Sequence, residues 1–524
     1  MSLSELSGQP GKVESIVQQL PYVAEPLARF GQLSHNSPAS LLLESAEISS
    51  KDHLKSLMLI DACLRLECRG QQVACEALSD NGKAVLEVLA SALAPQIAQQ
   101  NTDSLILHFT RASDQLDEDS RLKADSVFNA LRQIIQQITP IRDNPNAVFL
   151  GGVFAYDLLA SYEALPDVAE GPNDCPDFVF YVAETLILID HTQQTSELIG
   201  SVFSGAQVAT EYFRISQRME TLRKQLDLPV EPVTNNENAS RDVACNKDDD
   251  AFCRDVLALK EHILAGDIFQ VVPSRTFSLP CPAPLAAYAK LKALNPSPYM
   301  FYMQDAAFQL FGASPESALK YDKDANQVEV YPIAGTRRRG FNAAGQIDRD
   351  LDSRIELELR EDGKEKAEHL MLVDLARNDL ARVCEPGSRY VKDLLQVDRY
   401  SQVMHLVSRV VGQLRSDLDP LHAYTACMNM GTLVGAPKVS AARLIREVEQ
   451  CRRGSYGGAV GYLNSHGDMD TCIVIRSAFV KQGIAYIQAG AGVVYDSNPQ
   501  SEADETRNKA QAVIRAIQLA NGGQ

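Results

Sequence analysis

The stretch EKAEHLMLVDLARNDL, residues 365–380, carries the pattern to which the rest of the sequence can be related. Its spacing is helical, and an α-helix turns by about 100° per residue, so Glu365 and Glu368 share one flank with Leu372. The two carboxylates therefore point the same way, as metal ligands or partners in proton transfer must do. A single Glu pair at this spacing is more often a solvated helix face, so its meaning depends on context.

A second pair with the same spacing lies far downstream in PQSEADETRNKAQAVIRAI, residues 499–517. Pro499 and Ser501 signal the start of a helix, which places Glu502 and Glu505 on one flank of it. Four carboxylates on two helices resemble a cage for a divalent cation. Mg²⁺ suits such a cage because it prefers oxygen ligands and commonly bridges protein carboxylates to an anionic substrate.

Length and charge narrow the class of protein. The chain of 524 residues has 45% hydrophobic residues, enough for a large core, and its 68 acidic and 50 basic residues give a net charge of −18. This balance opposes binding to nucleic acid or to an anionic membrane surface. Eleven scattered cysteines, no signal-peptide pattern and no membrane-spanning stretch predict reduced thiols in a cytoplasmic protein, with Cys427 and Cys472 as structural thiols rather than nucleophiles.

Strand and helix patterns mix without the regular βαβ cadence of a parallel sheet. They predict an α+β fold with large, mainly antiparallel sheets faced by helices. Residues 1–30 are expected to form a short helix and turns, and FLGGVFAYD carries glycines that allow close strand packing. The polar stretch 229–250 is the best linker, dividing an N-terminal region, 1–228, from a second region, 251–524. The expected helices span residues 85–98, 211–226, 251–265, 283–294, 350–360, 364–382, 437–449 and 501–519.

Three motifs in the second half could hold an anion. PIAGTRRRG, residues 332–340, sets three arginines beside a turn; GAPK, residues 435–438, opens a helix; and QAGAGVV, residues 488–494, is a loop of small residues. Each motif alone is more often a turn, a solvated cluster or a helix cap. Beside an acidic cage they favour a small polycarboxylate as the substrate.

The same segments resemble the chorismate-binding enzyme family, and within it the large subunits of anthranilate synthases. The resemblance is carried, in consecutive order from about residue 250 to 515, by FGASPES, PIAGTRRRG, EKAEHLMLVDLARNDL, VDRYSQVMHLVSRVVG, GTLVGAPK, RRGSYGGAVGY, DTCIVIRSA, QAGAGVVYDS and SEADETRNKA. It extends more thinly into the first half through LLLES. It implies the chorismate-utilising fold, built from two interlocking halves.

The resemblance implies the conversion of chorismate and ammonia into anthranilate and pyruvate. It implies Mg²⁺ bound through Glu368 and Glu505, with Glu365 and Glu502 holding its waters. Residues implied to bind the substrate are Gly335, Thr336, Tyr456, Arg476, Gly490, Ala491, Gly492 and Lys509. Residues implied to be catalytic are Glu316 as general acid, His405 at the proton-removing step, Gln270 and Thr432.

Two positions separate this chain from sibling enzymes of the family. Relatives that add water carry a lysine base where this chain has Gln270, and relatives that make aminodeoxychorismate carry a nucleophilic lysine where it has Ala334. Free ammonia is therefore the expected nucleophile. Aminodeoxychorismate synthase and isochorismate synthase remain the sibling alternatives. A noncatalytic protein that binds divalent cations is the alternative from another class; it explains the Glu pairs but not Arg476 or Glu316.

No segment resembles a glutamine amidotransferase, so the resemblance implies a separate glutaminase subunit as the ammonia source, in a heterotetramer with two copies of each subunit. It also implies feedback inhibition by L-tryptophan. The matching effector residues are Glu44 and Ser45 of LLLES and Pro298, Tyr299 and Met300 of NPSPYM.

Overall fold

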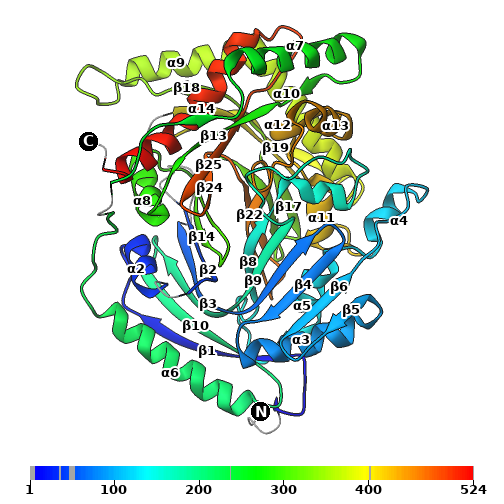
Figure 1. Ribbon diagram of the computed structural model, residues 1–524, viewed down its shortest axis with the longest axis vertical. Coiled ribbons are helices and arrows are strands. Elements are labelled where there is room, and N and C mark those ends of the chain that lie inside the picture. The colour runs from blue at the N-terminus through cyan, green and yellow to red at the C-terminus, as the bar shows by residue number, and fades with distance from the viewer. Residues whose placement is uncertain (1–5, 35–36, 46–53, 236–237, 401–402, 523–524) are drawn as a thin grey trace.

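The computed structural model describes residues 6–34, 37–45, 54–235, 238–400 and 403–522. In these ranges 23 strands form one continuous pairing network, a further pair forms a small ribbon, and helices cover the outside (Figure 1). Among the described strand pairings, β1 (Lys12–Leu20) with β7 (Thr139–Pro140) is parallel and all others are antiparallel. The predicted α+β class is confirmed.

Two long strands join two sheets. β3 (Lys55–Arg69) and β9 (Phe178–Asp190) pair along most of their length, with register shifts between residues 59 and 64. On one side of these shifts, β3 pairs with β2 (Ser40–Glu44) and β9 pairs with β10 (Thr195–Phe203). On the other side, β3 pairs with β4 (Gln72–Ala77) and β9 pairs with β8 (Phe149–Phe154). Such irregularities bend and twist strands, so one strand pair can belong to two sheets.

The remaining strands extend the two sheets outward. The first sheet continues from β2 through β14 (Tyr299–Gln304), β15 (Gln309–Ser314), β24 (Ser477–Lys481), β25 (Ile484–Gly490), β13 (Ser274–Pro280) and β11 (Ala244–Cys245). The second sheet continues from β8 through β22 (Ala459–Asn464), β23 (Met469–Ile473), β16 (Ser317–Asp322), β17 (Gln327–Val330) and β20 (Val403–Gln413), which also pairs with β18 (Ile333–Arg338) and β19 (Tyr390–Arg399). Its other edge is β4, β6 (Ser104–His108) and β5 (Ile97–Gln100).

Strands from the two halves of the chain interlock in both sheets, because β2 pairs with β14 and β8 pairs with β22. The two glycine-bearing motifs meet here, with Gly152 opposite Gly461. A Cβ on Gly152 would lie 2.1 Å from the carbonyl oxygen of Val179, and one on Gly461 would lie 2.1 Å from that of Asp470, so close strand packing requires both glycines. The predicted division at residues 229–250 remains a prediction.

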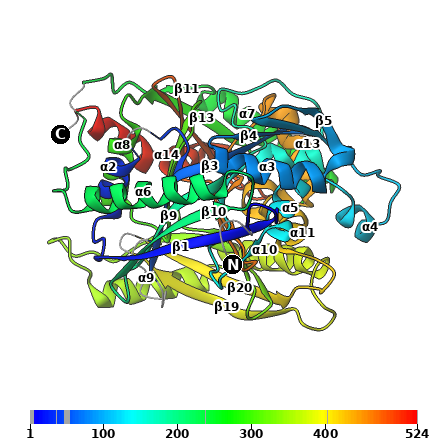
Figure 2. The same cartoon turned by 90° about the horizontal axis from the view of Figure 1, so that it is seen from below.

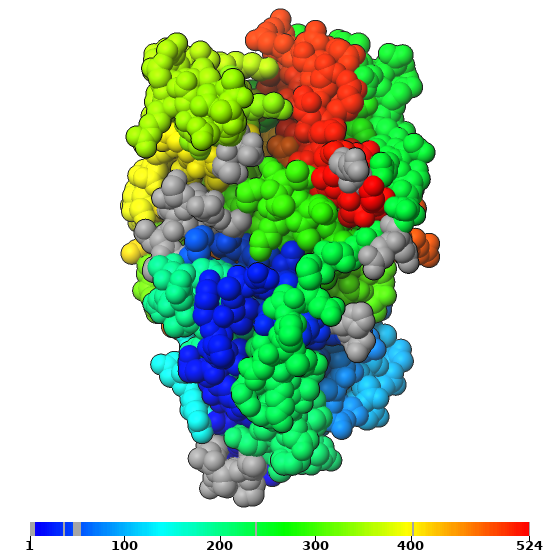
Figure 3. Space-filling view, turned by 90° about the vertical axis from the view of Figure 1, so that its left-hand side faces the viewer, coloured from blue at the N-terminus to red at the C-terminus, as the bar shows by residue number. Residues whose placement is uncertain are grey.

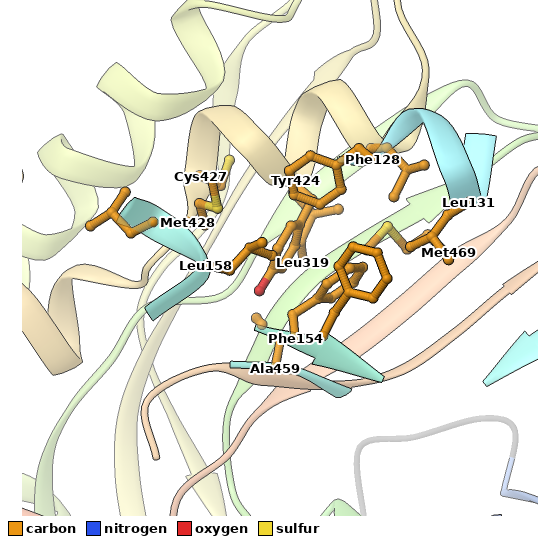
Figure 4. Packing of buried hydrophobic residues seen from close by; sticks show 14 of the residues in the cluster. Phe128, Leu131, Phe154, Leu158, Leu319, Tyr424, Cys427, Met428, Ala459 and Met469 are labelled. Carbon is orange, nitrogen blue, oxygen red and sulfur yellow. The ribbon is translucent and has the colours of Figure 1, made fainter. Parts of the chain in front are cut away.

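Apolar side chains form separate layers between and outside the sheets. Leu41, Phe149, Phe301 and Phe479 belong to a cluster with members on strands of both sheets, so it lies between them. Outside the second sheet, Phe154 stacks on Tyr424 of α11 (Pro420–Cys427) with ring centroids 4.4 Å apart, beside α5 (Asn129–Gln137) (Figure 4). Outside the first sheet, α6 (Val208–Leu226) runs across β10 (Figure 2).

Most predicted helices are confirmed, and their ends follow local chemistry. For example, α7 (Asp249–Ala265) starts where the Asp248 side chain accepts the Ala251 N–H and ends at Gly266, whose φ of 84° is left-handed. The other predicted helices of the second half are α8 (Pro284–Leu294), α9 (Arg349–Glu361), α10 (Gly363–Ala381), α13 (Lys438–Glu449) and α14 (Pro499–Ala520).

Three sequence-based expectations are wrong. Residues 12–20 form β1 rather than helix and turns, because this stretch pairs with β10 along its length. The helix expected at 85–98 is α3 (Asp80–Ala92), after which the chain enters β5. β19 was not expected, since its 10 residues alternate half-buried and exposed positions with little apolar signal. None of the helices in the described ranges is both long and apolar enough to cross a membrane, and none of the eleven cysteines, all within those ranges, forms a disulfide.

Candidate active site

α10 and α14 bring their carboxylates to the same end of the molecule, where the residues of α9, α10 and α14 gather (Figure 3). Each helix start is fixed by a cap. The Asp362 side chain accepts the N–H groups of Lys364 and Glu365, and the Asn498 side chain accepts that of Ser501. The caps place one Glu of each pair in the first turn and the other Glu one turn later.

The carboxylates of the two helices act on one another. Burial raises the pKa of Glu368, and the negative charges of Glu365 and Glu505 raise it further. Glu502 is 4% exposed, and its pKa is raised by burial and, less strongly, by Glu505. Two pairs of acidic side chains, separated from each other by more than a hundred residues in sequence, therefore lie close enough to repel one another.

Three of the four carboxylates also have a partner of their own. Glu365 pairs with Arg337 at 2.8 Å, Glu505 with Lys509 at 2.6 Å, and Glu368 accepts from the Gln270 amide at 2.8 Å. Within the described ranges, no three acidic, His or Cys side chains lie close enough as they stand to hold a metal ion. The donors are nevertheless all carboxylate oxygens whose mutual repulsion a cation would relieve, so the residues fit Mg²⁺ in chemistry once these partners are exchanged.

Gln270 is a neutral polar group that donates to this cage. It lies on β12 (Gln270–Val271), is 1% exposed, and its side-chain oxygen has no partner among the described residues. Gly492 makes this packing possible, because a Cβ there would lie 2.8 Å from the Gln270 side-chain nitrogen and 3.2 Å from a Glu368 oxygen. A buried acceptor without a donor is rare and points to a missing ligand N–H or O–H.

Two side chains, the guanidinium of Arg476 and the phenol of Tyr456, face the acidic cage. Arg476 has a left-handed φ of 49°, donates to the backbone oxygen of Lys509 at 3.0 Å, and has no carboxylate within ion-pair distance among the described residues. Burial lowers its pKa. The nearby Tyr456 is 5% exposed, and its hydroxyl contacts the backbone of Gly490. A half-buried guanidinium without a carboxylate partner among the described residues is suited to receive an anion.

The predicted anion loop at residues 490–492 follows β25. Lys509 donates to the Gly490 oxygen at 3.0 Å, which ties the loop to α14. The Ala491 N–H donates to the Pro273 oxygen at 3.1 Å, so its predicted role toward an anion requires that bond to be exchanged.

Glu316 lies in the turn between β15 and β16 and is 6% exposed. Its carboxyl accepts a hydrogen bond from the Thr432 hydroxyl at 3.1 Å; Thr432 lies on α12 (Gly431–Val434). Burial raises the pKa of Glu316 to about 8, although Thr432, Lys509 and Arg476 each lower it. Glu316 is therefore protonated at neutral pH, the state in which a carboxyl donates a proton.

His405 lies on β20 opposite Thr336 of β18, and its ring nitrogen Nδ1 is 3.0 Å from the Thr336 hydroxyl. Burial and the charge of Arg476 lower the pKa of His405 to about 4, while a hydrogen bond with the Gly335 backbone raises it. The imidazole is therefore neutral at pH 7 and free to accept a proton. Gly335 has a φ of 73° and sits against Glu365, where a Cβ would lie 3.2 Å from a carboxylate oxygen.

Two of the motifs proposed for anion binding have other partners. Arg337 pairs with Asp362 and Glu365, and Arg339 pairs with Asp352, so the arginine cluster fixes α9 and α10. Lys438 of GAPK pairs with Asp379 at 2.6 Å. These side chains therefore connect segments of the protein to one another, and this is a structural role. Sequence reasoning did not anticipate these partners because all four pairings join different segments of the fold.

The five predicted effector residues lie together, away from the carboxylate cage. Glu44 on β2 is opposite Met300 on β14, and its carboxylate accepts from Tyr288 at 2.8 Å and from Lys292 at 2.5 Å. The five residues line a cavity of about 840 Å³: Glu44, Ser45, Pro298, Tyr299 and Met300. Pro315 and Ser317, which flank Glu316, line the same cavity.

Known proteins resemble the whole chain. The family described as chorismate binding enzyme matches residues 89–515. Anthranilate synthase component 1 of Vibrio cholerae is 58% identical over 513 residues, which cover 98% of this chain and 97% of that one. The Escherichia coli (strain K12) protein of the same description is 57% identical over 517 residues, with 98% and 99% covered. The chain belongs to the anthranilate synthase component 1 family, within the chorismate-binding enzymes.

A solved structure of the family supports the same assignment. Anthranilate synthase component I from Streptococcus pneumoniae TIGR4 superposes with a TM-score of 0.66 at 28% identity, covering 90% of this chain and 94% of that one. The large antiparallel sheets faced by helices are therefore the fold of this family. The roles of individual site residues remain predictions.

We expect the Glu316 carboxyl to be protonated at pH 7 and to titrate near pH 8, because burial disfavours its charged form. Infrared difference spectra between wild type and Glu316→Gln should show a protonated carboxyl band that disappears near that pH. Thr432→Val removes a hydrogen bond that lowers the pKa, so the band should persist to higher pH. Thr425→Val, which changes a buried threonine bonded to Leu421, is the control. A spectrum without the band at pH 7 would contradict the assignment.

Proposed function

We propose that this protein converts chorismate and ammonia into anthranilate, pyruvate and water, as an Mg²⁺-dependent carbon–oxygen lyase of tryptophan biosynthesis. Its family membership supports chorismate as the substrate. The observation that carries the proposal furthest is the buried amide of Gln270, which donates to Glu368 while its own oxygen has no donor within the described structure. A neutral acceptor beside the metal cage is suited to orient ammonia and cannot activate water as a base.

Substrate binding follows from charge. Chorismate carries two carboxylates, and Arg476, Tyr456, Lys509 and the loop at residues 490–492 provide the cationic and donor groups around one of them. Arg476 has no carboxylate partner among the described residues, so an anion can bind to Arg476 without first breaking an internal ion pair of that residue. The other carboxylate would face the acidic helices, where Mg²⁺ would be held by Glu368 and Glu505, with Glu365 and Glu502 behind. When bound, Mg²⁺ supplies positive charge against that carboxylate and withdraws electrons from the ring.

The first half-reaction forms a carbon–nitrogen bond at C2 and breaks the carbon–oxygen bond at C4. Gln270 orients ammonia toward C2. Glu316 gives its proton to the departing C4 hydroxyl, which leaves as water. Its raised pKa keeps that proton in place at neutral pH, and Thr432 fixes the carboxyl.

The second half-reaction removes the proton from C2 and expels the enolpyruvyl group, which takes up a proton to become pyruvate. His405 is neutral and is oriented by Thr336 and the Gly335 backbone, so it can accept the C2 proton. Loss of the enolpyruvyl group and of the C2 proton makes the ring aromatic, and this gain in stability drives the step.

Sibling activities are the second candidates. Aminodeoxychorismate synthase or isochorismate synthase activity would need a lysine at position 334 or 270, and this chain has Ala334 and Gln270 there. A noncatalytic cation-binding role would leave Glu316 and Arg476 without a purpose. Both alternatives predict no anthranilate.

Ammonia is expected to come from a glutamine amidotransferase partner, because component 1 proteins are named as one part of an enzyme. We infer a heterotetramer with two copies of each subunit. Sedimentation of the purified complex would give the stoichiometry.

The test of the function is product identification from chorismate, Mg²⁺ and ammonium. We expect anthranilate, detected by its fluorescence, together with pyruvate. At fixed free ammonia, kcat/KM for chorismate should fall as pH rises through about 8, because Glu316 must be protonated. Glu316→Gln should lower kcat by roughly 10²- to 10⁴-fold and remove this pH dependence. Accumulation of aminodeoxychorismate or isochorismate would contradict the proposal.

L-Tryptophan is the proposed inhibitor, and the cavity at Glu44 and Ser45 is its proposed site. An inhibitor acts only through its different affinities for two states of the protein. The same cavity borders the residues on either side of Glu316, and it is also lined by Tyr400, whose ring contacts His405 with centroids 5.3 Å apart. Filling it therefore can displace the catalytic acid and base without contact with chorismate.

Ser45→Phe should fill part of this cavity and relieve inhibition by L-tryptophan at least about tenfold, with ammonia-dependent kcat nearly unchanged. The reason is steric, since Ser45 lines the cavity and lies outside the catalytic group. Thr195→Phe places the same ring on another part of the wall and should keep inhibition. The measurement is the tryptophan concentration that halves the rate; loss of inhibition and activity together would contradict a separate effector site.

A further inference from the structure

A buried ion pair lies beneath the proposed substrate site. Arg453 is 1% exposed, and its guanidinium makes two parallel bonds to Glu449 of α13, at 2.9 and 2.6 Å. Neither residue belongs to the predicted site, and nothing in the proposed chemistry uses their charges. A buried pair of this kind contributes little net stability compared with apolar residues of similar size, so its retention calls for another explanation.

The remaining bonds of Arg453 reach two backbone segments that carry proposed site residues, and a contact with the Tyr456 ring reaches a third. Arg453 donates to the Leu433 oxygen at 2.8 Å, one residue after Thr432, and to the Val272 oxygen at 2.6 Å, two residues after Gln270. Its guanidinium also lies 5.6 Å from the centre of the Tyr456 ring. One planar cation therefore fixes the segments that hold Thr432, Gln270 and Tyr456 relative to one another.

Glu449 extends the network to a fourth segment. One of its oxygens accepts both the N–H and the hydroxyl of Ser274, at 2.8 and 2.7 Å. The Ser274 hydroxyl in turn accepts from Gln488 at 2.8 Å, and Ser274 is paired across the sheet with Gly490. The loop at residues 490–492 is thus anchored, through β13, to the same ion pair.

We propose that the Arg453–Glu449 pair is the positioning unit of the active site, which sets the distance between the acid at Glu316–Thr432, the ammonia-orienting Gln270 and the carboxylate-binding Tyr456 and Gly490. This inference rests on the proposed function. The fork of arginine matters because lysine cannot bond Glu449 twice and two carbonyls at once. Neither residue touches the substrate, so both act through the groups they hold.

A matched ion pair elsewhere separates positioning from stability. Arg65 on β3 makes two bonds to Asp305, at 2.9 and 3.2 Å, and the Asp305 side chain is fully buried. Arg65 also pairs with Glu67, and neither Asp305 nor Glu67 is a proposed catalytic or substrate-binding residue. Arg65→Lys should therefore lower the melting temperature while leaving catalysis unchanged.

The experiment compares Arg453→Lys, Glu449→Gln, Ser274→Ala and Arg65→Lys in the full-length protein, well below each melting temperature. The assay is anthranilate formation from chorismate, Mg²⁺ and ammonium. We expect Arg453→Lys and Glu449→Gln to lose up to about 100-fold in kcat/KM, with KM for chorismate raised and kcat lowered, because small displacements of reacting groups are costly. Ser274→Ala, the mildest change, should raise KM mainly, since it removes the hydroxyl that links Glu449 to Gln488 but keeps the bond from the Ser274 N–H to Glu449.

The pH profile gives a readout that stability alone does not move. In Arg453→Lys the fall in kcat/KM near pH 8 should shift, because Leu433 and with it Thr432 are no longer held against Glu316. Arg65→Lys should keep the wild-type profile, KM and kcat within about twofold. The inference is overturned if Arg453→Lys and Ser274→Ala keep wild-type KM, kcat and pH profile while only their melting temperatures fall. Wild-type protein that forms no anthranilate would instead overturn the proposed function.

Discussion

Electrostatic repulsion between carboxylates from two distant helices is the constraint on which the rest of the structure depends. Glu368 is half-buried between Glu365 of its own helix and Glu505 of α14, and its pKa is raised by burial and by both charges. A folded protein maintains such an arrangement only if the surrounding structure fixes it. Here the fixing elements are the two helix caps, the Gln270 amide and the absence of a side chain at Gly492.

The two interlocked sheets explain how residues so far apart in sequence meet. β3 and β9 belong to both sheets, and each sheet joins strands of the two halves of the chain, at β2–β14 in the first sheet and at β8–β22 in the second. β25 of the first sheet ends at Gly490, and β12, which carries Gln270, directly precedes β13 of that sheet, while β18 and β20 of the second sheet carry Thr336 and His405. The site therefore forms only when both sheets are complete, and the proposed effector cavity, lined by strands of both sheets, borders the residues on either side of Glu316.

Acidic and cationic groups are separated in a way that suits a dicarboxylate. Glu316 is neutral because it is buried, His405 is neutral for the same reason, and Arg476 keeps a charge without a carboxylate partner in the described structure. A proton donor, a proton acceptor and an anion receptor thus lie beside an acidic cage without neutralising one another. Such separation is how one site performs acid and base chemistry at the same pH.

Local signals in the sequence predicted the parts of this arrangement that depend on neighbours along the chain. Helix spacing and caps gave α10 and α14, and the sheet class followed from strand patterns. The strand β1 was misjudged because its partner β10 lies far away in sequence, and β19 because half of its side chains face solvent. The partners of Arg337, Lys438 and Arg453 are set by tertiary packing. The motifs RRR and GAPK alone therefore could not reveal whether their charged side chains bind a ligand or another helix.

Convergence of Glu368 and Glu505 on one cation is the central claim, and a calorimetric double-mutant cycle tests it most directly. Mg²⁺ would be titrated, with benzoate present to supply a ring carboxylate, into wild type, Glu368→Gln, Glu505→Gln and the double variant, with the exposed Asp374→Asn of α10 as control. Two groups that bind the same ion are coupled, so each single variant should weaken binding about tenfold or more and the double variant should be weaker by less than the product of the two losses. Unchanged affinity in both single variants, or losses that multiply independently, would contradict the account.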